Sequence, residues 1–224
     1  MRLMKSPSLE DLFVEHVGPS MAKHLALLRA VEGLPCNIGL KRGDARFGDR
    51  YTFPVQLLGI EDPDGAAWTW SWALPAAQVA PPLTRTALEL KAWGEDRGVD
   101  LFFAPKFGLA GMTGDQIAIV SCGLAEAAAF LVAETELGTA FLLFPDLGGR
   151  IPTRHSGAFL AEVLPEVLTT YTIPDHRGAV RSLLRFEGYE IREAGDTWEA
   201  HRGGDLLTVS FDRQGRVSGL RVRS

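Results

Sequence analysis

Three tryptophans alternate with two hydroxyl residues in Trp68-Thr69-Trp70-Ser71-Trp72, and this run limits the fold more than any other feature of the chain. Side chains alternate between the two faces of a β-strand, so a strand here places three indoles on one face. An exposed face of three indoles would be a large adhesive surface. We therefore expect an aromatic layer that packs a sheet against a helix. The alternative is a stacking platform for a sugar, a base or an aromatic ligand, with Trp68, Trp70 and Trp72 as the ligand-binding residues.

The composition of the 224-residue chain is that of an ordinary globular protein, with 46% hydrophobic and 23% charged residues. Its net charge of -5 argues against a nucleic-acid partner, which requires an excess or a stripe of basic residues. No apolar run reaches the roughly 18 residues of a membrane-spanning helix, and the first residues lack the apolar stretch of a signal peptide. Cys36 and Cys122 are expected to be reduced thiols of a cytoplasmic protein.

Helical periodicity predicts three helices before residue 145, over 8–30, 83–93 and 113–133. Ser8 with Asp11 forms a capping signature at the first of these helices, and Thr113 opens a capping box at the third. Gly18-Pro19 is expected to break or kink the first helix, because proline removes a backbone donor.

Short apolar runs between turn signals predict strands over 36–41, 46–47, 51–60, 66–73, 101–104 and 140–144. A Pro- and Gly-rich stretch follows at 145–152. Beyond it the sequence predicts a helix over 157–169, a helix capped by Asp175 that ends at Phe186, and strands over 189–193, 197–201, 206–211 and 217–222. Short turns between successive strands imply antiparallel pairing.

These elements predict an α+β fold. An antiparallel sheet covered by helices is followed by a smaller helix-plus-antiparallel-meander segment. Because few contacts are expected to cross a stretch rich in proline and glycine, 145–152 is the predicted domain boundary. It separates an N-terminal α+β domain, residues 1–146, from a small C-terminal α+β domain, residues 153–224.

The stretch 56–98 resembles the signature of an uncharacterised bacterial family of unknown function. That signature combines Q-L-L-G, a turn, W-x-W-x-W-A-N-P and L-x-x-x-G-E, and this chain carries Q-L-L-G at 56–59 and W-G-E at 93–95. Leu-Pro at 74–75 replaces the family's Asn-Pro, so any role of that asparagine is absent here. The resemblance spans roughly 8–144. It implies a small domain and brings no catalytic residue, cofactor or activity.

Three other patterns admit a functional interpretation, and the structural one is favoured for each. The glycines of 108–114 are spaced G-x-x-G-x-x-G, which matches neither a dinucleotide fingerprint nor a P-loop. Residues 62–65 resemble part of a calcium loop, but Ser71 stands where that loop requires glutamate. His16 and His24 lie eight residues apart, whereas zinc ligands on one helix are three or four apart. We expect no metal and no cofactor.

Three functional hypotheses remain open. The favoured one is a non-catalytic cytoplasmic binding or protein-interaction module of accessory, immunity or chaperone-like type, with a protein partner or a homodimer and no identified small molecule. The second is a small-molecule binder that uses the tryptophan face or a cleft between the two segments. The third is a hydrolase with an unrecognised site among Ser156, His155, Asp175 and His176, although no G-x-S-x-G motif supports it.

Overall fold

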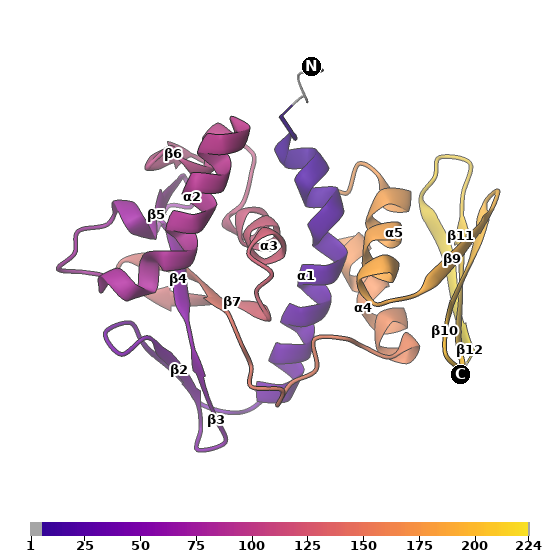
Figure 1. The fold of residues 1–224 in the computed structure, drawn as a ribbon, viewed down its shortest axis with the longest axis horizontal. Coiled ribbons are helices and arrows are strands. Elements are labelled where there is room, and N and C mark those ends of the chain that lie inside the picture. Colours follow the sequence, from indigo (N-terminus) through magenta and orange to yellow (C-terminus); the bar gives the residue numbers. More distant parts are fainter. Residues whose placement is uncertain (1–5, 224) are drawn as a thin grey trace.

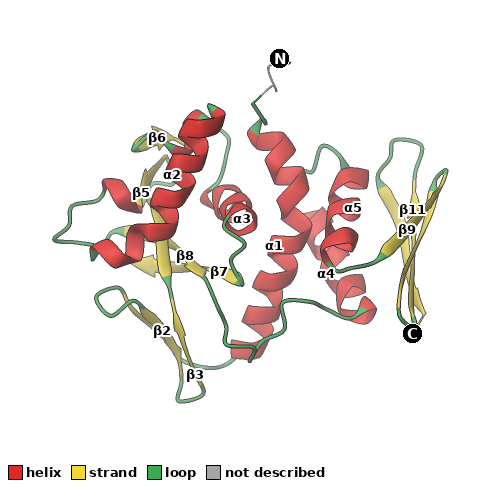
Figure 2. Ribbon diagram, viewed as in Figure 1, coloured by secondary structure: helices red, strands yellow, loops and turns green. Residues whose placement is uncertain are grey.

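The computed structural model describes residues 6–223, which form an α+β fold with antiparallel sheets (Figure 1, Figure 2). The helices are α1 (Leu9–Val31), α2 (Arg85–Arg97), α3 (Gly114–Leu124), α4 (Gly157–Thr170) and α5 (His176–Phe186). The strands are β1 (Cys36–Gly39), β2 (Asp44–Phe47), β3 (Tyr51–Pro54), β4 (Gln56–Glu61), β5 (Ala67–Trp70), β6 (Lys106–Gly108), β7 (Ala129–Thr135), β8 (Gly138–Phe144), β9 (Glu190–Ala194), β10 (Thr197–Arg202), β11 (Asp205–Phe211) and β12 (Val217–Arg223). Short 3-10 helices are η1 (Ser71–Ala73), η2 (Pro81–Thr84) and η3 (Asp100–Phe102).

Helix α1 lies in the middle of the molecule, between two groups of strands (Figure 1). On one side are the sheet β6-β5-β4-β8-β7 and the smaller sheet β1-β2-β3, and on the other is the meander β12-β11-β10-β9. Helix α1 packs on α3 toward the first group and on α4 and α5 toward the meander. One hydrophobic cluster therefore continues from the tryptophans through α1 to the meander, and another joins the two sheets of the first group. The predicted fold class is confirmed, and the division into two domains stays a prediction.

Local capping signals determine where helices begin. The hydroxyl of Ser8 accepts the amide of Asp11 at 3.1 Å, and the hydroxyl of Thr113 accepts the amide of Gln116 at 3.3 Å. The Asp175 side chain caps α5 in the same way. Such side-chain oxygens satisfy amides of the first turn that have no partner inside the helix. The predicted starts of α1, α3 and α5 are confirmed. None of the described helices is long and apolar enough to span a bilayer.

Contrary to the sequence-based expectation of a break, α1 continues through Gly18 and Pro19. The proline leaves the carbonyl of Glu15 without its helical donor. The Ser182 hydroxyl of α5 donates to that carbonyl instead. Gly18 allows α5 to approach, because a Cβ added there would lie 2.8 Å from the Cβ of Leu183. A proline is tolerated in this helix because the neighbouring helix supplies the missing hydrogen bond.

The tryptophan run is a strand only as far as Trp70. Trp68 and Trp70 are each 0% exposed, with their ring centroids 5.4 Å apart in an edge-to-face arrangement. The amide of Trp70 donates to the carbonyl of Pro105, but the residues before Pro105 form η3, so β5 has no further partner on that side. Trp72 lies in η1, half-buried, with the Lys91 Nζ 5.0 Å from its ring centroid. The expectation that all three indoles share one strand face is therefore wrong for Trp72.

Two residues of the Q-L-L-G motif have structural roles, one through hydrogen bonds and one through packing. The Gln56 side chain donates to the Pro82 carbonyl at 3.1 Å and accepts the Thr86 amide at 3.2 Å, which fastens the start of α2. Gly59 lies against Trp68, since a Cβ added to it would lie 2.4 Å from the indole atom Cζ2. The glycine and the first tryptophan of the signature thus form one contact.

Three other expected elements differ from the structure. The stretch 101–104 belongs mainly to η3 and the turn after it rather than to a strand. Helix α3 ends at Leu124, and the apolar residues from Ala129 onward form β7, paired with β8. Periodicity cannot separate a buried helix from a buried strand in so short an apolar run. The stretch 51–60 divides at Val55 into β3 and β4, which belong to different sheets. The helices and strands predicted after residue 152 are confirmed.

Replacing Gly59 with alanine should destabilise the fold by about 1–3 kcal/mol, the usual range for an overpacked core. The added methyl group would meet the Trp68 ring at 2.4 Å and the Thr69 carbonyl at 2.8 Å. Urea denaturation measures the change in free energy of unfolding. Gly219→Ala in β12 is the matched control, because its nearest neighbour is the Ser210 Cβ at 3.7 Å. The control should change stability by less than about 0.5 kcal/mol. Equal losses for the two variants would contradict the packing role.

Candidate functional site

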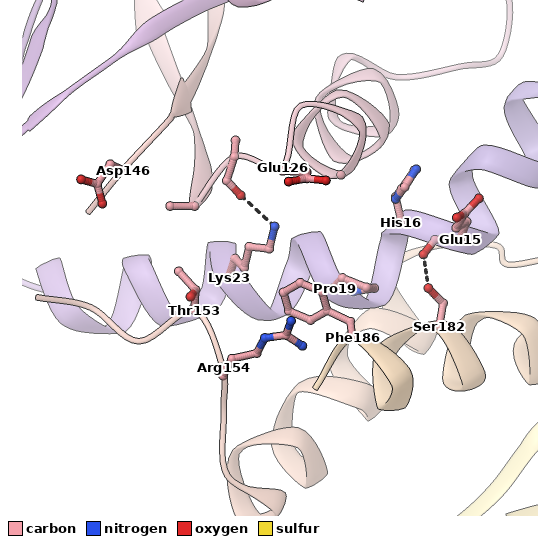
Figure 3. Close-up of a pocket in the computed structure, with 13 residues that line it drawn as sticks. Glu15, His16, Pro19, Lys23, Glu126, Asp146, Thr153, Arg154, Ser182 and Phe186 are labelled. Atoms are coloured by element: carbon pink, nitrogen blue, oxygen red, sulfur yellow. Dashed lines mark hydrogen bonds between the residues drawn. The ribbon is translucent and has the colours of Figure 1, made fainter. Parts of the chain in front are cut away.

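A cleft of about 620 Å³ opens beside α1, where the turn after α3, the stretch between β8 and α4, and α5 meet (Figure 3). This volume lies in the usual range for small-ligand sites. Its ionisable lining residues are Glu15, His16, Lys23, Glu126, Asp146 and Arg154. Ser182 and Phe186 form the α5 wall. The cleft therefore collects both signs of charge from segments that are far apart in the sequence.

Lys23 is the buried cation of the cleft, with 5% of its surface exposed. Its Nζ donates to the Ala127 carbonyl at 2.7 Å and lies 5.0 Å from the centroid of the Phe186 ring. No ion pair within residues 6–223 includes Lys23. Lysine is almost never so buried without an anionic partner, because leaving water costs a charged group a great deal of free energy.

His16 lies one helical turn away from Pro19 on the same wall of the cleft (Figure 3). Its ring packs against Gly123, where an added Cβ would lie 2.3 Å from the ring atom Cγ. The Nε2 atom is buried and has no hydrogen-bond partner in the described part of the chain. Burial lowers the pKa of His16, the nearby Glu15 carboxylate opposes that effect, and the Lys23 ammonium adds to it. The imidazole is therefore neutral at neutral pH.

Glu126 has a backbone conformation that is unusual for a residue with a side chain. Its φ angle is +50°, in the left-handed region that glycine normally occupies just after a helix. An L-residue in this region costs on the order of 1–2 kcal/mol. The Glu126 amide donates to the Gly123 carbonyl at 3.1 Å, which holds the turn in place. Its carboxylate belongs to the cleft lining (Figure 3).

Arg154 is held in place by the residue that follows it, His155, which belongs to a buried polar cluster. The guanidinium carbon of Arg154 lies 4.0 Å from the centroid of the Phe186 ring. Next to it, the His155 Nδ1 and the Glu187 Oε1 are 2.7 Å apart, and the Glu187 side chain is fully buried. Arg202 of β10 donates to the backbone carbonyls of both residues. The wall of the cleft that carries Arg154 is thus tied to the meander.

The tryptophans proposed from the sequence as binding residues lie outside this cleft. Trp68 and Trp70 are buried in the core, and the Trp70 Nε1 donates to the Leu101 carbonyl at 2.9 Å. Trp72 packs against the same core. These positions support the interpretation of the tryptophans as a packing layer.

Each residue of the hydrolase hypothesis has a separate partner. His155 pairs with Glu187, Asp175 caps α5, and the His176 Nδ1 accepts the Val217 amide at 3.4 Å. The Ser156 hydroxyl accepts the Phe159 amide at the start of α4. Within residues 6–223, no hydrogen bond joins two members of this set. The structure therefore does not show a catalytic relay among them.

The two histidines of α1 have different surroundings. His16 lines the cleft, whereas the His24 Nδ1 bonds to the Phe130 carbonyl at 2.9 Å and its ring stacks on the ring of that residue. Across residues 6–223, no group of three or more His, Cys, Asp or Glu residues is arranged to hold a metal ion.

The sequence patterns did not indicate Lys23, Glu126 or Arg154 as binding residues. A signal for the first was present, because Lys23 falls between Met21 and Leu25 in the apolar part of α1. A lysine at a position predicted to be buried is itself informative. Nothing in the neighbouring sequence marks the other two, since the left-handed turn and the ring contact arise only in the folded chain.

The fold and the cleft define an α+β protein with a polar cleft at the junction of two segments. The chain belongs to the DUF6882 family, a family of unknown function whose model matches residues 10–147. This range agrees with the resemblance found in the sequence. It contains Lys23 and Glu126 but ends before Arg154 and Phe186, so the segment beyond the family match supplies one wall of the cleft. Neither the curated proteins nor the solved structures contain a match to the chain.

The protein should lose stability as pH falls below about 6.5, the value of a histidine in an unfolded chain. Because the pKa of His16 is lowered by burial in the folded state, the unfolded chain takes up the proton first. The contribution of the neutral imidazole is thus complete above that pH and is lost below it. Urea denaturation at several pH values should show a steeper acid loss for the natural protein than for His16→Gln. NMR titration of the His16 ring provides a direct check, and a normal or raised pKa would contradict the effect of burial on this ring.

Replacing Glu187 with alanine should cost on the order of 3–5 kcal/mol, because it leaves the buried His155 and the partly buried Arg202 without their shared acceptor. The free energy of unfolding measures this loss. Glu193→Ala is the control, since its ion pair with Arg181 is partly exposed and should contribute less than about 1 kcal/mol. Losses of similar size for both glutamates would contradict the role of Glu187.

Proposed function

We propose that the protein is a binding module and that the cleft beside α1 takes a small ligand with an anionic group. Of the hypotheses that the sequence left open, this corresponds to small-molecule binding between the two segments. We also propose that it acts in the cytoplasm, where its thiols, Cys36 exposed and Cys122 buried, would remain reduced.

The observation that carries this proposal is the burial of Lys23 without a carboxylate partner. Its ammonium group has three hydrogen-bond donors, and the Ala127 carbonyl accepts one of them at 2.7 Å. An anionic ligand group beside Nζ would supply both the missing charge and the missing acceptors. Arg154 adds a second cation at the same wall, which favours an anion there further.

The Ala127 contact also gives Lys23 a structural role, since it holds the turn between α3 and β7. The two roles are separable. A lysine needed only for that hydrogen bond affects folding alone, whereas a lysine that binds a ligand affects affinity in a protein that remains folded.

Lys23→Met should abolish or weaken ligand binding by about tenfold or more while the protein stays folded. Methionine keeps the length and the apolar stem of the side chain but removes the charge. The measurement is thermal unfolding and titration calorimetry with inorganic phosphate and a panel of small carboxylates and phosphate esters.

Lys106→Met is the matched control, because Lys106 is an exposed lysine of β6 outside the cleft. It removes the same charge and should leave affinity unchanged. At a ligand concentration of about 100 times Kd, the natural protein should gain about 2.7 kcal/mol of stability. The proposal fails if no anion binds the natural protein, or if Lys23→Met binds as tightly.

A further inference from the structure

We infer that the ligand of the cleft is a small zwitterion, a molecule with a carboxylate and a primary ammonium group on an apolar skeleton, as in a free apolar amino acid. The inference rests on the proposed function, because it assigns the ligand chemistry of the same cleft. It follows from the two signs of charge in the lining and from the absence of pairing between them in the described chain.

The cations of the cleft lie over one aromatic ring. The Lys23 Nζ and the Arg154 guanidinium carbon are 5.0 and 4.0 Å from the centroid of Phe186. Lys23 directs one donor to the Ala127 carbonyl, and its other donors have no acceptor within residues 6–223. A carboxylate has two oxygens, and each can accept a hydrogen bond from a cationic donor.

Carboxylates bring the opposite charge into the same cleft, from Glu15 on α1, Glu126 after α3 and Asp146 after β8. Figure 3 shows Glu126 on the far side of Lys23 from Arg154 and Phe186. One oxygen of Asp146 accepts the amide of the nearby Gly148, but the Glu126 carboxylate has no hydrogen bond or ion pair in the described part of the chain. The Glu15 carboxylate also has no such partner there, but Figure 3 shows Glu126 nearer to Lys23, so we assign the ammonium group to Glu126.

The charged residues of the cleft do not neutralise one another. None of the ion pairs within residues 6–223 joins two of its lining residues. A purely anionic ligand meets the carboxylates, and a purely cationic one meets Lys23 and Arg154. A ligand that carries both charges can pair with the cations and with the carboxylates of the cleft. The like charges of the lining repel singly charged ligands, which gives the site specificity. Pro19 and Phe186 offer apolar surface for its side chain.

The backbone of Glu126 provides independent support. Its φ of +50° is a strained conformation for a glutamate, and such strain is found at functional sites. Glycine at this position would remove the strain and the carboxylate together. A variant that folds at least as well but binds less tightly separates a binding role from a structural one.

To test the inference, binding to the full chain is measured for compounds that share a skeleton but differ in their charged groups. They are L-leucine and L-phenylalanine, their N-acetyl derivatives without the ammonium group, and isopentylamine and phenethylamine without the carboxylate. Titration calorimetry should show that at least one of the two amino acids binds about tenfold or more tightly than its matched derivatives. If an N-acetyl compound or inorganic phosphate binds as tightly, the zwitterion inference is overturned while an anion-binding function stands. If none of these compounds binds, both are overturned.

Glu126→Gly should bind the amino acid about tenfold less tightly, retain its affinity for the N-acetyl compound, and melt no lower than the natural protein without ligand. Ala110→Gly is the control, because Ala110 is another residue at positive φ, +42°, and lies outside the cleft. It should leave the affinity for the amino acid unchanged. Natural affinity in Glu126→Gly would overturn the assignment of the ammonium group to that carboxylate.

Discussion

The structure depends on α1 remaining one helix through Pro19. That residue deprives the Glu15 carbonyl of its helical donor, and the Ser182 hydroxyl of α5 takes the place of the missing amide. Gly18 lets α5 approach closely enough for this contact. On the opposite side of the helix, the Ser20 hydroxyl donates to a carbonyl of α3 at 2.8 Å. A single continuous helix can therefore present one face to each half of the molecule, and both hydrophobic clusters include its residues.

Local features of the fold could be predicted because their causes act over a few residues. Caps such as Ser8 and Thr113 locate helix starts, and alternation locates the meander after residue 152. The failures have tertiary causes. Trp72 lies in η1 rather than in β5, which ends at Trp70, and the apolar residues from Ala129 onward form a strand because β8 pairs with them. The cleft was beyond local prediction, since its lining spans 15–186 and is assembled by helix packing.

Three departures from ordinary folding rules occur together in the cleft. Lys23 is a buried cation without an ion pair in the described chain, Glu126 holds a conformation suited to glycine, and the His16 Nε2 has no hydrogen-bond partner there. Buried polar atoms without hydrogen-bond partners also occur outside the cleft in the described chain, at the Trp68 Nε1 in the core and at the His155 and His201 Nε2 atoms in the C-terminal segment. Sequences that fold well satisfy local and tertiary preferences together, and places where they do not are expected to be functional or strained. The concentration of charge, strain and an unsatisfied ring nitrogen at one cleft favours function as its cause.

Because the cleft lies between the two segments, a ligand bound there affects how stably they dock. Lys23 and Glu126 lie in the range matched by the family model, whereas Arg154 lies beyond it and is held to the meander through Glu187 and Arg202. A ligand that contacts both sets binds only while α1 and the C-terminal segment keep this arrangement. Its binding free energy therefore adds to the free energy of docking the segments, because any ligand stabilises the state that binds it. The same geometry that brings opposite charges together across the junction thus makes ligand binding and segment docking a single coupled equilibrium.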